Sequence, residues 1–205
     1  MNKETKQNKQ KINTRYLVQV AMLAAAGSVL MMWDFPLWFL PPFYKIDLGE
    51  IPVIIGSLAM GPVAGILIAF LKNIIKIITQ SSSTAGIGEL ANFVIGCALI
   101  IPPGIMYKIK RSRKNAMIGL VIGILSMSII GGLFNAFLLL PFYAAAYNMP
   151  MSTLIGMGSA VNKWITDLPT FIIFAVVPFN IIKGTIVTII CAFLYKPISP
   201  ILKIK

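Results

Sequence analysis

The sequence predicts an all-α membrane protein, a bundle of six transmembrane helices with both chain termini in the cytoplasm. Hydrophobic residues make up 58% of the 205 residues and charged residues only 12%, with a mean hydropathy of +0.86. A soluble domain carries about a quarter charged residues and has no interior large enough for this many apolar side chains. The apolar residues also form runs near the length of a membrane span, with basic clusters between them.

Six apolar segments account for the predicted helices. They cover residues 16–33, 51–60, 62–79, 89–107, 116–140 and about 178–195. Five of them approach the length of about 20 residues that an apolar helix needs to cross the hydrocarbon layer. The second is too short to cross in a straight line, and Gly61-Pro62 ends it with a turn signal. Pro178 is expected either at the first turn of the last helix or at a kink in it, in which case the helix starts earlier.

The remaining segments are predicted to be tails and outer loops. Residues 1–15 form a polar, basic tail without a convincing secretory signal, so the next apolar run is expected to be a retained helix. The membrane domain covers residues 16–196. Its outer loops are predicted at 34–49 and at 141–177, the latter with a short helix. Residues 197–205 are predicted to be a second cytoplasmic tail.

The basic residues predict the orientation, because Lys and Arg are enriched on the cytoplasmic side of membrane proteins. The N-terminal tail, the loop between the fourth and fifth predicted helices and the C-terminus carry 13 of the 18 basic residues. All three clusters share one side if the short second helix counts as a crossing. The net charge of +12 does not indicate nucleic acid, because clusters separated by apolar runs do not form a continuous binding face.

Several kinds of chemistry find no support in the residues. The chain has no histidine, which removes His-based acid–base catalysis and His-ligated metals. Cys97 and Cys191 lie in apolar runs, which is typical of small buried side chains. No GxxxxGK[ST] motif indicates ATP hydrolysis, and no Ser/His/Asp or paired-carboxylate arrangement indicates an enzyme. We expect no enzyme activity, no metal and no cofactor.

Polar residues on the predicted outer side indicate a pocket. Glu89 and Asn92 are three residues apart, as are Asn180 and Lys183, so each pair shares a helix face. Asn135 lies in the outer third of the fifth predicted helix. Ionisable and polar groups at membrane depth usually face a cavity or a partner, and apolar walls with a few convergent polar groups are typical of ligand sites. The alternative is that these groups pair with one another, for example Glu89 with a lysine.

The polar residue types limit the ligand. Lys72 and Lys76 share one face of the third predicted helix. One or two net lysines in the pocket would suit a neutral or weakly anionic molecule, whereas a diphosphate would need more cations. Asparagine amides both donate and accept, so they suit the amide or imide edge of a heterocycle. The residues therefore favour a flat, neutral, partly apolar heterocycle.

The first outer loop could cover such a ligand. It is rich in aromatic side chains, which could lie over a flat ring or could form an interfacial aromatic belt. These side chains are Trp33, Phe35, Trp38, Phe39, Phe43 and Tyr44.

The first predicted helix carries closely spaced small residues. Ala21 and Ala25 are four apart, as are Ala24 and Ser28, and this spacing permits close helix approach. The surface could pack within the chain or dock another membrane subunit.

Three long segments carry a resemblance to a known family. They are KIDLGEIPVIIGSLAMGPVAGILIAFLKN (45–73), STAGIGELANF (83–93) and VPFNIIKG (177–184). The chain resembles the substrate-binding S components of energy-coupling-factor (ECF) vitamin transporters, specifically the riboflavin-specific branch. The resemblance covers nearly the whole chain and implies a six-helix bundle in the bacterial plasma membrane.

The resemblance also implies a riboflavin pocket that opens outward beneath the first outer loop. The implied ligand contacts are Asn180, Lys183 and Asn135, with Glu89 and Asn92 in either a contacting or a structural role. The implied lid residues are Tyr44, Lys45 and Asp47, with the other loop aromatics.

The predicted function is capture of riboflavin from outside for ATP-driven uptake by a separate coupling module. The implied partners are a transmembrane coupling subunit, docked at Ala21 and Ala25, and two ATP-binding subunits. Two other functions stay open, a self-sufficient permease or exporter and a membrane-embedded enzyme. The absence of a P-loop and of an internal repeat disfavours the permease, and the lack of a catalytic constellation disfavours the enzyme.

Overall fold

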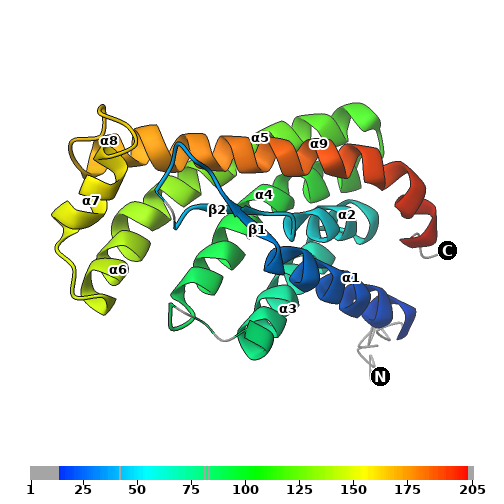
Figure 1. Ribbon diagram of the computed structural model, residues 1–205. Helices are drawn as coiled ribbons and strands as arrows, with labels where there is room; N and C mark the ends of the chain where they lie inside the picture. Colours follow the sequence, from blue (N-terminus) through cyan, green and yellow to red (C-terminus); the bar gives the residue numbers. More distant parts are fainter. Residues whose placement is uncertain (1–13, 42, 81, 83, 203–205) are drawn as a thin grey trace, which may run out of the picture.

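A computed structural model describes residues 14–41, 43–80, 82 and 84–202, with side chains described up to residue 195. Most of the predicted N-terminal tail and residues 203–205 lie outside this part. The described residues are mainly helical, with one short two-stranded hairpin (Figure 1). The helices are α1 (Thr14–Met32), α2 (Glu50–Met60), α3 (Pro62–Gln80), α4 (Ile87–Ile109), α5 (Arg113–Phe134), α6 (Leu140–Ala146), α7 (Met151–Ser159), α8 (Leu168–Phe171) and α9 (Val177–Leu202). The strands are β1 (Asp34–Pro36) and β2 (Lys45–Asp47).

Two stretches of π-helix join helices into longer units. The π turn Asn135–Leu139 connects α5 to α6, and the π turn Ile172–Val176 connects α8 to α9. Among the described residues, five helical stretches are long and apolar enough to cross a membrane, including the continuous stretches Arg113–Ala146 and Leu168–Tyr195. Together with the shorter α2, they give the chain the architecture of a multi-pass membrane protein, as the sequence predicts. Six crossings and cytoplasmic termini stay predictions.

The prediction of an outer loop over residues 141–177 is wrong for most of that segment. Helical structure continues through Ala146 and resumes at Leu168, so the non-helical parts are 147–150 and 160–167, on either side of α7. The last helical stretch begins about ten residues earlier than predicted and contains Pro178 in its interior. In Figure 1, α8 and α9 run as one long rod. The predicted C-terminal tail is also helical through Leu202.

Local signals explain the early start of the last helix. The Asp167 side chain accepts a hydrogen bond from the backbone N–H of Thr170, and the Thr170 hydroxyl accepts one from the backbone N–H of Asp167, both at 2.9 Å. This capping box satisfies donors that a helix N-terminus leaves free. Pro178 does not end the helix. Pro141 and Pro178 each lie two residues after a π turn. The altered backbone hydrogen bonding there tolerates a residue that has no N–H donor.

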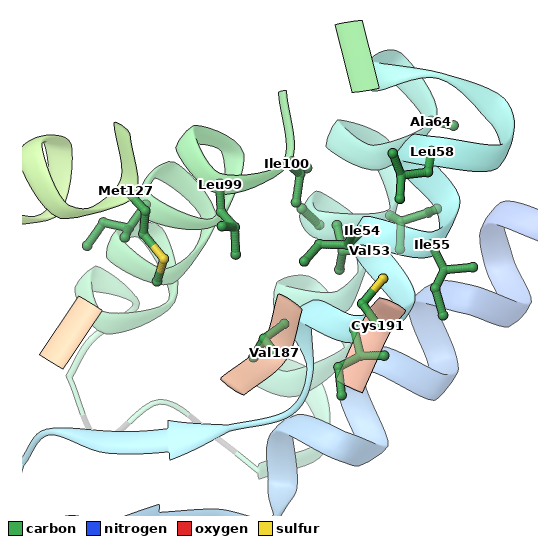
Figure 2. Packing of buried hydrophobic residues seen from close by; sticks show 14 of the residues in the cluster. Val53, Ile54, Ile55, Leu58, Ala64, Leu99, Ile100, Met127, Val187 and Cys191 are labelled. Atoms are coloured by element: carbon green, nitrogen blue, oxygen red, sulfur yellow. The ribbon is translucent and has the colours of Figure 1, made fainter. Parts of the chain in front are cut away.

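Helix α2 lies at the centre of the apolar core (Figure 2). It packs against α1, α3, α4 and α9, and nine of its 11 residues are buried. A helix that is apolar on all sides belongs in such an interior, where other helices rather than lipid surround it. Figure 2 shows the α2 side chains Val53, Ile54, Ile55 and Leu58 among those of the neighbouring helices. The labelled neighbours are Ala64 of α3, Leu99 and Ile100 of α4, Met127 of α5, and Val187 and Cys191 of α9.

A second apolar cluster fixes the loop between α1 and α2. Within this loop, β1 pairs antiparallel with β2, with Phe35 opposite Ile46. Tyr44 and Ile46 are buried against Phe171 and Phe179 of the last helical stretch. The hairpin is therefore held over the helices, and its end leads directly into α2.

Candidate ligand-binding site

A cavity of about 220 Å³ lies between the hairpin and helices α1 to α6 and α9. All eight residues that the sequence predicts for the ligand site line this cavity. They are Tyr44, Lys45, Asp47, Glu89, Asn92, Asn135, Asn180 and Lys183. The structure thus brings together side chains from the first loop, α4, the π turn after α5, and α9. Their role as ligand contacts stays a prediction.

Asp47 and Lys183 join the hairpin to α9. The Nζ of Lys183 donates to Oδ2 of Asp47 at 2.6 Å, and the backbone N–H of Gly49 donates to Oδ1 at 2.9 Å. Burial alone would raise the pKa of Asp47, but the charges of Lys183 and Lys72 and these two hydrogen bonds lower it below its ordinary value. Asp47 is therefore ionised near neutral pH and holds the hairpin to α9.

A second buried ion pair joins α2 to α3. The Nζ of Lys72 lies 2.6 Å from Oε1 of Glu50, and the two side chains are 0% and 2% exposed. A buried charge is very costly unless it is paired, so these two residues require each other. Glu50 also lines the cavity.

Every lysine that lines the cavity has a carboxylate nearby. Besides the pair of Lys183 and Asp47, Lys45 lies 3.1 Å from Asp34, and Lys76 lies 3.9 Å from Glu89. The expectation of one or two net lysines is therefore wrong for the residues that line the cavity. The hairpin and α4 supply these carboxylates, which the sequence could not assign to particular lysines. The paired charges favour a neutral ligand.

Two asparagines are held by their own helices. The Nδ2 atoms of Asn135 and Asn180 donate to the carbonyls of Gly131 and Val176, four residues earlier, at 2.8 and 2.9 Å. The Tyr44 hydroxyl donates to Oδ1 of Asn135 at 2.8 Å. Burial, aided by the nearby Tyr143, raises the pKa of Tyr44 well above its ordinary value, so this donor keeps its proton. The amides are thus fixed at the cavity wall.

Five of the six loop aromatics divide into two groups, and the sixth, Phe39, is half-buried. Phe43 and Tyr44 line the cavity, with Tyr143 and Phe179 from the helices, and the rings of Tyr44 and Phe179 lie 5.1 Å apart. In contrast, three loop aromatics are exposed on the surface of the described chain. They are Trp33 (70% exposed), Phe35 (56%) and Trp38 (90%). These three do not line the cavity, so a role in covering a ligand stays a prediction for them. Their exposure is compatible with the interfacial belt.

Glu89 has protein partners on both oxygens. Its Oε2 accepts from the Ser82 hydroxyl at 2.7 Å, and its Oε1 lies 3.9 Å from the Nζ of Lys76. The carboxylate therefore ties the start of α4 to the preceding turn and to α3. This arrangement favours the structural role for Glu89.

The small residues of α1 lie on two faces. Ala24 and Ser28 are buried within the bundle, whereas Ala21 and Ala25 are exposed on the surface of the described chain. Packing within the chain thus accounts for the first pair. The second pair is left on a surface that faces lipid or a partner.

Sequence reasoning missed the Glu50–Lys72 pair as part of the site. Glu50 stands directly before the apolar run of α2, and Lys72 stands inside the apolar run of α3. A charge inside an apolar run is a signal for a buried partner. The sequence could have identified both residues by this signal, but not their pairing.

Comparisons with known proteins agree with this architecture. The family model described as "ECF transporter, substrate-specific component" matches residues 15–195. The riboflavin transporter RibU of Staphylococcus aureus is 32% identical over 203 residues, covering 99% of both chains. The riboflavin transporter FmnP of Bacillus subtilis is 32% identical, covering 92% of this chain and 94% of that protein.

A solved structure supports the same assignment. The S component of a bacterial ECF transporter superposes with a TM-score of 0.71 at 32% sequence identity, covering 93% of this chain and 98% of that chain. The family match spans almost all of the described residues. The chain therefore belongs to the family of substrate-specific components of ECF transporters.

Proposed function

We propose that this chain is a riboflavin-binding S component that captures riboflavin outside the cell for uptake by an ATP-driven coupling module. The observation that carries the proposal is the similarity over 99% of both chains to a protein named riboflavin transporter. Such coverage includes the hairpin, the cavity and every described helix. We further propose that the chain is a transporter subunit and not an enzyme.

The chemistry of the cavity suits this ligand. Riboflavin is neutral, with a flat ring that bears an imide and with a tail of hydroxyl groups. The ring would lie near Tyr44, Phe179 and the amides of Asn135 and Asn180, since these provide aromatic surface and both donors and acceptors. The ion pairs leave none of the lysines that line the cavity dedicated to an anion. At about 220 Å³ the cavity is smaller than most small-molecule sites, so side chains would shift as the ligand enters.

The membrane arrangement follows from the same proposal. The five long helical stretches and α2 would give six crossings, with the basic clusters and both termini on the cytoplasmic side of a bacterial plasma membrane. A transmembrane coupling subunit would dock on the exposed Ala21 and Ala25 of α1, which allow close approach. Two ATP-binding subunits would drive the transport cycle.

Titration of the purified chain with riboflavin tests the proposal. In detergent, the protein should quench flavin fluorescence at one flavin per chain. Tyr44→Phe should weaken binding about 5- to 20-fold, because it leaves Oδ1 of Asn135 without its donor. A wild-type protein that is folded but does not bind riboflavin would rule the proposal out. Uptake by cells that express this chain without any coupling subunits would instead support a self-sufficient permease.

A further inference from the structure

Two hydrogen-bond acceptors at the cavity wall lack a donor within the part of the chain that the structure describes. They are Oε2 of Glu50 and Oδ1 of Asn92, and both atoms are buried. Both residues line the cavity. Native proteins leave few buried polar atoms without a partner, because each one loses its hydrogen bonds to water. These two acceptors therefore indicate donors that arrive with a ligand.

Helix α4 places the two acceptors close together. Gly96 follows Asn92 by four residues, so both lie on one face of the helix, one turn apart. A Cβ atom at Gly96 would lie 2.9 Å from Oε1 and 3.1 Å from Oε2 of Glu50. The Glu50 carboxylate thus occupies space that a side chain at position 96 would take. Position 96 is about one helical turn from Asn92.

The partner of Glu50 leaves one oxygen available. Lys72 approaches Oε1 at 2.6 Å, so the ion pair engages only this oxygen. The oxygens of a carboxylate accept hydrogen bonds. The cavity wall therefore presents a carboxylate oxygen and an amide oxygen, both in need of donors.

We infer that Glu50 and Asn92 form a hydroxyl-binding subsite that holds the polyol tail of the ligand. This inference rests on the proposed function and deepens it. The imide edge of a flavin places one N–H between two carbonyl oxygens, and those oxygens would oppose a pair of acceptors. Neighbouring hydroxyl groups each carry a donor and match the pair. The ring then lies toward Tyr44, Asn135 and Phe179, and the tail toward α2 and α4.

Two flavins that differ only at the tail test the subsite. Riboflavin and lumiflavin share the ring, but lumiflavin carries a methyl group in place of the hydroxylated tail. Affinities would be measured by fluorescence quenching with the full-length chain in detergent. Glu50→Gln should weaken riboflavin binding about 10- to 100-fold and leave lumiflavin unchanged, since it removes a charged acceptor. Asn92→Ala should weaken riboflavin binding about 3- to 10-fold, with the same selectivity.

A third variant covers the case in which Glu50→Gln does not fold, since it leaves Lys72 without its charged partner. Gly96→Ala keeps every charge but adds a methyl group against the Glu50 carboxylate. It should also weaken riboflavin selectively. Ser128→Ala is a matched control, because this buried hydroxyl on α5 donates to the Ile124 carbonyl of its own helix. It should change neither affinity.

Equal losses of affinity for both flavins would assign these residues a structural role and overturn the subsite. Unchanged riboflavin affinity in the folded variants would also overturn the subsite. Wild-type protein that binds both flavins equally well would overturn the subsite while the proposed function stands. Wild-type protein that binds neither flavin would overturn the proposed function itself.

Discussion

The two ends of helix α4 meet very different surroundings. Toward its C-terminal end, α4 packs so tightly on α5 that a Cβ at Gly123 would lie 2.3 Å from the carbonyl oxygen of Leu99. Toward its N-terminal end, the same two helices help to enclose the cavity, with Asn92 on α4 and Met127 on α5 among its lining residues. Small residues bring the backbones together at one end. Polar side chains and paired charges occupy the space at the other.

The bundle thus combines a closely packed apolar half with a polar half that contains the cavity. The apolar half gains stability from burial and close packing, which depend on shape. In the polar half, each charge is tolerated only because a partner from another segment neutralises it. A substitution in the apolar half should therefore change stability alone. A substitution in the polar half should change stability and ligand affinity together.

The largest effect is expected from breaking the most buried ion pair. Lys72→Met leaves the Glu50 carboxylate buried without its partner, which should cost about 3–5 kcal/mol of folding stability. The double variant Glu50→Met/Lys72→Met should recover most of this loss, because no charge is then left unpaired. Thermal unfolding in detergent measures both. A double variant no more stable than the single one would contradict the pairing argument.

A smaller and pH-dependent loss is expected at the other buried pair. Asp47→Asn should cost about 3 kcal/mol near pH 7, because Lys183 loses its charged partner. The pKa of Asp47 in the folded chain is lower than its ordinary value of 3.8. The contribution of Asp47 to folding stability is therefore complete above about pH 5. It is lost as the pH falls through the pKa that Asp47 has in the folded chain. The gap in unfolding temperature between wild type and variant should hold from pH 7 to pH 5 and close below pH 3.8. A gap that closes nearer neutral pH would refute this assignment.

Overpacking the apolar half should act on stability alone. Gly123→Ala forces a methyl group against the backbone of α4 and should cost about 1–3 kcal/mol. The folded fraction should bind riboflavin with unchanged affinity. Gly156→Ala is the matched control, because an added Cβ there meets nothing within 4 Å, and it should leave the unfolding temperature nearly unchanged. A large loss of affinity in Gly123→Ala would show that the two halves are coupled.

The smallest effect is expected at the exposed edge of the cavity. Lys45 and Asp34 form an ion pair whose side chains are 46% and 37% exposed, and such pairs contribute about 0–1 kcal/mol. Lys45→Ala should therefore lower the unfolding temperature only slightly, by an amount that shrinks further with added salt. A loss as large as that of Asp47→Asn would mean that Lys45 is much less solvated than its exposure indicates.

The amino-acid sequence by itself determined the membrane class, the first four helices to within a few residues, and the residue types of the site. These features depend on local properties, namely the length of apolar runs, turn signals and the cost of polar groups in lipid. The start of the last helix was also present locally, in Asp167 and Thr170. Pro178 lies between this capping box and the apolar run that predicts the helix, and a proline is a common but not a certain helix boundary.

The pairing of the charges and the choice of aromatic side chains that face the cavity depend on the assembled bundle. Asp47 and Lys183 are 136 residues apart, and no local pattern could choose between Lys183 and Lys72 as the partner of Asp47. The exposure of Trp38 and the burial of Tyr44 likewise depend on how the hairpin lies over α9. These features follow from contacts between distant segments, and such contacts exist only once the bundle has assembled.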